Sequence, residues 1–80
     1  ENSKASKMLA QGKVLLVNRD NNFVIINLGE DSGVKVGDAF QVYRQGQFVA
    51  QVKAIQARRG ITACDIVKES MPIKVGDILK

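Results

Sequence analysis

Two stretches of this chain, residues 33–40 and 72–79, carry nearly the same sequence. The first reads Gly-Val-Lys-Val-Gly-Asp-Ala-Phe and the second Pro-Ile-Lys-Val-Gly-Asp-Ile-Leu, with equivalent positions 39 residues apart. In a chain of only 80 residues, such a repeat predicts two similar half-units that close into one small barrel. We therefore expect an all-β fold with an approximate internal twofold repeat.

The length of the chain allows one small domain. Residues 1–11 read as a polar lead-in, either flexible or the end of an upstream helix, and residues 12–80 as a single β-barrel domain. With 45% of its residues apolar, mostly Val, Ile and Leu, the chain has enough material for a core. The chain begins at Glu1, so we expect it to be a piece of a longer protein. No segment in it reads as a signal peptide or a membrane span.

Short β-rich segments alternate with turn residues along the barrel region. The Asp-Asn-Asn sequence at 20–22 and the Gln-Gly pair ending at Gly46 are typical hairpin turns, and Gly29–Gly33 reads as a loop. Ile55 interrupts the polar face of the fourth segment, which indicates a bulge or bend there. Six strands are expected, over residues 13–19, 23–28, 39–44, 47–57, 61–67 and 78–79.

Each copy of Val-Lys-Val-Gly-Asp is interpreted as a structural turn. The two apolar residues are expected to point inward, while the glycine permits a reversal and the aspartate accepts main-chain N–H bonds. The predicted turn residues are Gly33, Gly37, Asp38, Gly46, Gly76 and Asp77. The predicted core consists of Val14, Leu16, Val24, Ile26, Leu28, Val36, Phe40, Val42, Val52, Ile66, Val75 and Ile78.

Catalytic and metal-binding chemistries find little support in the composition. A catalytic pair of Asp38 and Asp77 would need a pattern such as Asp-Thr/Ser-Gly, which neither copy has. The chain has no histidine, and its one cysteine, Cys64, lies in a strand context that predicts a small buried side chain. The acidic loop at 29–33 offers too few oxygen ligands for calcium and the wrong charge for phosphate. We expect no enzyme activity, no cofactor and no metal site.

The formal net charge of +4 permits an anionic partner without requiring one. The basic side chains could form a stripe on one side of the barrel, and small barrels do bind single-stranded nucleic acid in this way. However, the few aromatic residues are needed partly for the core. The candidate contact surface consists of Arg44, Lys53, Arg58 and Arg59.

The sequence also resembles a known family. The segments that carry the resemblance are Gly-Lys-Val at 12–14, Phe-Val-Ile-Ile-Asn-Leu-Gly at 23–29, Gly-Val-Lys-Val-Gly-Asp at 33–38, Phe-Gln-Val-Tyr-Arg at 40–44, Ala-Cys-Asp-Ile-Val at 63–67 and Val-Gly-Asp at 75–77. They are similar to small β-barrel domains of bacterial envelope proteins, including the C-terminal domain of flagellar assembly protein T. The resemblance implies a non-catalytic, SH3-like barrel, often carried behind a membrane anchor outside the cytoplasmic membrane.

The expected function is protein–protein interaction or scaffolding in the bacterial periplasm or cell envelope. Sheet edges or the loops at 30–32 and 68–71 are the expected contact surfaces. A barrel that binds single-stranded nucleic acid through its basic surface is the alternative. The sequence does not identify the partner or the oligomeric state.

Overall fold

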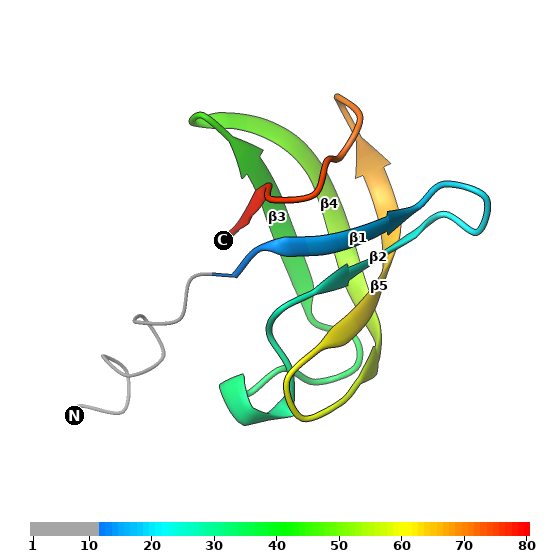
Figure 1. The fold of residues 1–80 in the computed structure, drawn as a ribbon, viewed down its shortest axis with the longest axis vertical. Helices are drawn as coiled ribbons and strands as arrows, with labels where there is room; N and C mark the ends of the chain where they lie inside the picture. The colour runs from blue at the N-terminus through cyan, green and yellow to red at the C-terminus, as the bar shows by residue number, and fades with distance from the viewer. Residues whose placement is uncertain (1–11) are drawn as a thin grey trace.

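The computed structural model describes residues 12–80, which form one curled antiparallel sheet (Figure 1). The strands follow the expected segments closely, with β5 extending two residues further than predicted. Their bounds are β1 Val14–Asn18, β2 Phe23–Ile26, β3 Ala39–Arg44, β4 Gln47–Ala57, β5 Thr62–Glu69 and β6 Ile78–Leu79. The loop before β3 holds a short 3-10 helix, η1, at Glu30–Ser32. The lead-in predicted for residues 1–11 lies outside the described residues.

The strands lie in the order β1-β2-β5-β4-β3-β6. A bridge between Lys13 and Ile78, together with backbone hydrogen bonds beside it, brings the two ends of the sheet together. The result is a half-barrel, which confirms the all-β fold class. Because the two ends of the sheet meet, β6 and β1 also count as neighbours. If β1, β2 and β3 change places with β4, β5 and β6, respectively, every strand keeps the same kind of neighbours. The approximate twofold repeat of the two complete halves remains a prediction.

Turn chemistry explains how these short strands are connected. The β3–β4 hairpin has positive φ at both Gln45 (51°) and Gly46 (79°), the conformation that matches the right-handed twist of the strands. In the β1–β2 turn, Asn22 takes a φ of 58°, which asparagine tolerates better than most residues. Gly33, at φ 87°, ends the 3-10 helix and turns the chain toward β3.

The core lies inside the curl of the sheet and consists mainly of β-branched side chains. Most of the predicted core is confirmed, with Leu28 and Phe40 packing at its margin and Ile78 partly exposed. The sequence interpretation did not include several buried core residues, among them Val34, Val49 and Ala50. The buried hydrophobic residues are Val14, Val24, Ile26, Val34, Val42, Val49, Ala50, Val52, Ala54, Cys64, Ile66, Ile73 and Leu79.

Three residues predicted to be in the core are exposed instead: Leu16 (46%), Val36 (66%) and Val75 (66%). Leu16 follows a β-bulge, which shifts the inward-facing position to Val17. Val36 and Val75 precede glycines with positive φ, where the strand alternation is broken. Each Val-Lys-Val or Ile-Lys-Val triplet therefore buries only its first apolar residue, Val34 or Ile73.

Candidate interaction surface

The first Val-Lys-Val-Gly-Asp turn is closed by its own aspartate. Asp38 Oδ2 accepts a hydrogen bond from the Lys35 N–H at 2.9 Å. Gly37, at φ 99°, donates to the Ala54 carbonyl at 2.8 Å, and the Ala54 N–H donates to the Asp38 carbonyl at 2.8 Å. Two residues of the turn thus lie opposite one residue of β4.

The second turn repeats this arrangement on β1. Asp77 Oδ2 accepts from the Lys74 N–H at 2.8 Å. Gly76, at φ 95°, donates to the Val14 carbonyl at 2.8 Å, and the Val14 N–H donates to the Asp77 carbonyl at 2.9 Å. The duplicated motif therefore builds the same turn twice, once against each of two strands.

The two aspartates nevertheless differ in their surroundings. Asp77 is only 4% exposed, and Arg44 donates to both of its carboxylate oxygens, at 2.8 and 2.9 Å. Burial raises the pKa of Asp77, but the hydrogen bonds from Arg44 and Lys74 outweigh it and hold the pKa below its ordinary value. Asp38 is exposed. The two carboxylates therefore serve their own turns, and Asp77 also anchors Arg44.

A β-bulge follows Val14 on β1 and Ala54 on β4, the residues to which the two turns are hydrogen-bonded. On β1 the register shifts between Val14 and Leu16, leaving Leu15 as the extra residue, and on β4 it shifts between Ala54 and Gln56, leaving Ile55. Leu15 is 46% exposed and Ile55 is 45% exposed. Because the turns pair antiparallel with these strands, Val75 lies beside Leu15 and Val36 lies beside Ile55. The structure thus places an exposed aliphatic pair at each turn.

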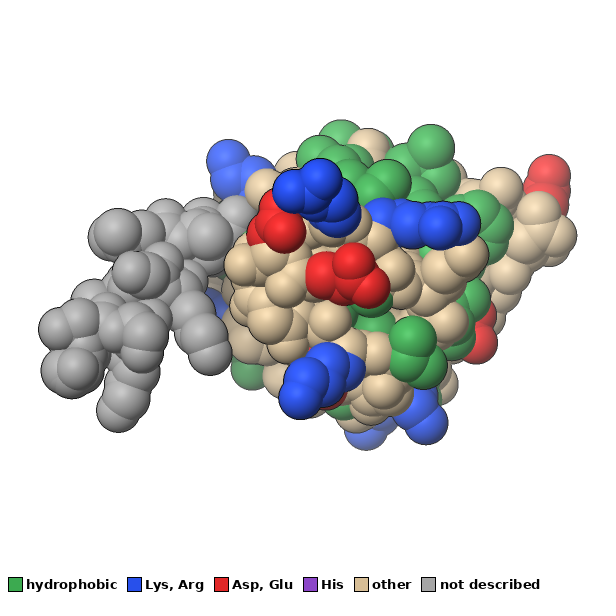
Figure 2. Space-filling view, turned by 90° about the horizontal axis from the view of Figure 1, so that it is seen from below, with side chains coloured by type: hydrophobic (Ala, Val, Ile, Leu, Met, Phe, Trp, Pro, Cys, Tyr) green, Lys and Arg blue, Asp and Glu red, His purple; other side chains and the backbone are tan. Residues whose placement is uncertain are grey.

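Cross-strand register joins these two pairs across the outside of the sheet. Leu16 lies opposite Ile25, Ile25 opposite Ala63, and Ala63 opposite Gln56, which follows Ile55. Exposed hydrophobic side chains gather at the upper side of the view in Figure 2. We call the continuous set the outer band. It consists of the half-buried Ile25 and Ala63 and of the exposed residues Val75, Leu15, Leu16, Ile61, Ile55 and Val36.

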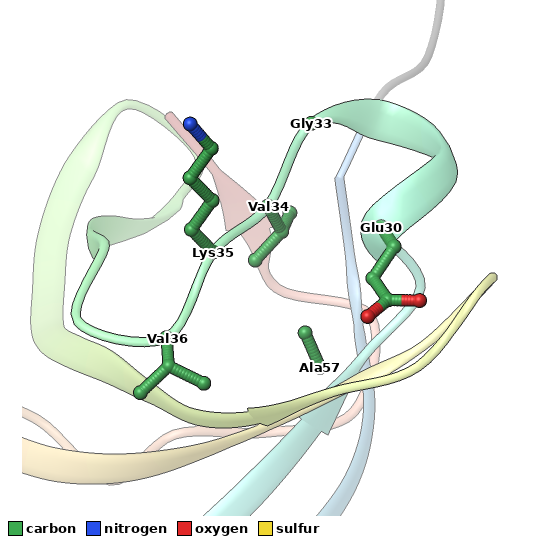
Figure 3. A pocket seen from close by; sticks show the side chains of 6 residues that line it. All are labelled: Glu30, Gly33, Val34, Lys35, Val36 and Ala57. Carbon is green, nitrogen blue, oxygen red and sulfur yellow. The ribbon is translucent and has the colours of Figure 1, made fainter.

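An open groove of about 450 Å³ lies at the Val36 end of the outer band. It is lined by η1, by the loop that leads to β3 and by the end of β4 (Figure 3). In this view Glu30 and Ala57 lie on one side of the groove, and Lys35 extends on the other. The lining residues are Glu30, Gly33, Val34, Lys35, Val36 and Ala57.

The four predicted basic contact residues do not gather into one cluster. Arg44 ends β3 next to the start of β4, whereas Arg58 and Arg59 follow the far end of β4. Lys53 lies between them, opposite Asp65. The Arg44 guanidinium is engaged with Asp77 and also donates to the Pro72 carbonyl at 2.7 Å. The role of these residues as a contact surface remains a prediction.

The sequence interpretation missed the ion pair between Arg19 and Glu69, as it missed that between Arg44 and Asp77. Arg19 donates from Nη1 and Nη2 to the two carboxylate oxygens of Glu69, at 3.0 and 2.7 Å, and Glu69 also accepts from the Ile73 N–H at 3.0 Å. The hydrogen bonds from Arg19 lower the pKa of Glu69, against the effect of burial. This pair joins the β1–β2 turn to the end of β5. Because the partners are 50 positions apart, no local pattern signals it.

The one cysteine and the acidic side chains of residues 12–80 are candidates for reactive or metal-binding arrangements. Cys64 is fully buried, as predicted, and burial together with the neighbouring Asp65 raises the pKa of its thiol to about 12. Within this range, no three His, Cys, Asp or Glu side chains come together as metal ligands. None of its helices is long and apolar enough to cross a membrane.

Comparison with known proteins gives one result. Residues 21–52, which include β2, η1, β3 and the first turn, match the family model of the flagellar assembly protein T C-terminal domain. No curated protein and no solved structure matches the chain significantly. The match agrees with the resemblance seen in the sequence, and it covers less than half of the chain.

Proposed function

We propose that this domain is a non-catalytic module for protein–protein interaction or scaffolding in the bacterial cell envelope, and that the outer band is its contact surface. The match to a domain of a flagellar assembly protein supports an assembly role. It also supports an envelope location, since the flagellum passes through the envelope.

The outer band is the observation that carries this proposal. Val36 and Val75 are each 66% exposed, and the bulge residues between them are nearly half exposed. Single exposed aliphatic side chains are ordinary on protein surfaces, but a contiguous set is typical of a binding surface. Bulges that hold Leu15 and Ile55 outward present these side chains at a cost to the regularity of the sheet.

Photocross-linking in the bacterium that makes the protein tests the proposal. Benzoylphenylalanine would replace Leu16 or Ile55 in the full-length protein, with exposed Gln47 as the control position. We expect discrete protein adducts from the two band positions and none from Gln47. Adducts from the loop residues Asp31 or Ser70 alone would refute the band as the contact surface.

The nucleic-acid alternative and the location are tested separately. Fluorescence anisotropy with a labelled single-stranded oligonucleotide should show no binding that depends on Arg58 and Arg59. Salt-sensitive binding that is lost in the Arg58→Ala, Arg59→Ala variant would overturn the proposal. A fusion of alkaline phosphatase to the C-terminus of the full-length protein should be active, because this enzyme matures outside the cytoplasm.

A further inference from the structure

We infer that the outer band binds an amphipathic helix of a partner protein, one that carries carboxylates near both ends and places one large apolar side chain in the groove beside Val36. This inference rests on the proposed function and adds the chemistry and conformation of the partner. Three features of the surface support it: its charges, its length and its lack of free backbone groups.

The charges lie at the two ends of the outer band. Lys35 precedes Val36 and Lys74 precedes Val75, and both lysines are exposed. Asp38 and Asp77 accept hydrogen bonds from the backbone N–H groups of these lysines. In the described part of the chain the salt bridges join other residues. The Lys74 ammonium attracts the Asp77 carboxylate, and both lysines are exposed to a partner. Carboxylates at matching positions would add complementarity and a faster association rate.

The length of the outer band sets the spacing of those carboxylates. The band crosses β1, β2, β5 and β4 and reaches one turn beyond each outer strand. With neighbouring strands about 4.8 Å apart, the path along the curled sheet is about 24 Å, and the straight distance between its ends is shorter. A helix of about 16 residues rises about 24 Å. The acidic residues of the partner are therefore expected at most about four turns apart.

The outer face of a paired sheet presents side chains rather than free backbone N–H and C=O groups. An extended partner segment lying across β1, β2, β5 and β4 would leave its own backbone without hydrogen bonds, whereas a helix satisfies its backbone internally. The groove of about 450 Å³ at the Val36 end has room for one anchoring side chain.

Two other occupants fit this surface less well. Both ends of the outer band carry a lysine, Lys35 or Lys74. If two copies of the chain met through this band, lysines would face lysines in either orientation, and like charges repel. A lipid surface is usually met by protruding loops or interfacial aromatic residues, but the outer band lies on the sheet and contains no aromatic side chain. The chain has no tryptophan.

The test selects helical 20-residue peptides from a displayed library against the 80-residue chain. We expect enriched peptides with an apolar stripe and Asp or Glu near both ends, and binding about tenfold weaker to the Leu16→Ser, Ile55→Ser variant. Used as bait, the Lys35→Glu, Lys74→Glu variant should instead enrich peptides with Lys or Arg near both ends. The Lys68→Glu, Lys80→Glu variant changes the net charge equally and should leave the acidic preference unchanged.

The outcomes separate this inference from the proposed function. Peptides that need Leu16 and Ile55 but show no charge preference, or that bind in an extended form by NMR, would overturn the inference and leave the interaction module standing. Selection that never depends on the outer band would overturn both. Concentration-dependent dimerisation through Leu16 and Ile55, or co-sedimentation with phosphatidylglycerol vesicles that these residues govern, would also overturn the inference.

Discussion

Asp77 and Arg44 form a two-pronged ion pair across the sheet, with Nε 2.8 Å from Oδ1 and Nη2 2.9 Å from Oδ2. The same Asp77 oxygen that meets Nη2 also accepts the Lys74 N–H and closes the second turn. One carboxylate therefore joins the end of β3 to the chain that leads into β6. Asp38 closes the first turn with its own backbone bond, so the duplicated motif offers a matched pair of positions.

We expect Asp77→Ala to lower the free energy of unfolding by about 2 kcal/mol, because it removes several hydrogen bonds at a buried carboxylate. Asp38→Ala removes a bond at an exposed turn and should cost about 0.5–1 kcal/mol. Urea unfolding followed by circular dichroism would measure both. Equal losses in the two variants would show that the Arg44 pair adds nothing.

Stability should fall on acidification because the pKa values of Glu69 and Asp77 are both lowered in the folded protein. A carboxylate with a lowered pKa stabilises the fold fully above its unfolded pKa, and that stability is lost as the pH falls through the folded pKa. The midpoint of urea unfolding should therefore be nearly constant from pH 7 to about 5 and decline below about pH 4. In Glu69→Gln, Asp77→Asn the decline should be shallower, whereas an unchanged slope would contradict the assignment.

Cys64 should be inert in the native protein. Its thiol is buried, and a pKa of about 12 leaves almost no thiolate at pH 8. We expect no reaction with Ellman's reagent on the minute timescale at pH 8, and full reaction in denaturant. Rapid labelling of the native chain, with circular dichroism unchanged, would contradict this burial.

The sequence predicted strands and turns well because alternation and turn chemistry are local. Gln45 and Gly46 define a hairpin by themselves, and the repeat located both Gly-Asp turns. The sequence interpretation failed where a bulge or a glycine with positive φ breaks the period of two. Leu16 follows a bulge, while Val36 and Val75 precede such glycines, and all three are exposed.

The outer band could not be predicted, because it depends on register between strands that are distant in the sequence. Leu16, Ile25 and Ala63 become neighbours only once β2 pairs with both β1 and β5. A hint was present in Ile55, which interrupts the polar face of its strand. The ion pair between Arg19 and Glu69 could not be predicted for the same reason, because the two residues meet only in the assembled sheet.

Gly29 offers a sharp test of how the 3-10 helix is attached to the sheet. The Glu30 and Asp31 N–H groups donate to the Arg58 and Arg59 carbonyls at 2.6 and 2.9 Å. This contact brings Gly29 so close to the β4–β5 loop that an added Cβ would lie 2.6 Å from the Arg59 carbonyl oxygen. Gly29→Ala should therefore destabilise the fold by about 1–3 kcal/mol, the usual cost of overpacking.

Gly60 is the matched control, since it lies in the same loop and a Cβ there meets nothing within 4 Å. We expect Gly60→Ala to change the thermal midpoint little. Gly29→Ala should lower it clearly and also loosen the groove, because η1 forms one of its walls. Hydrogen exchange would then show faster exchange at the Glu30 and Asp31 amides, while equal midpoints for the two variants would refute this close packing.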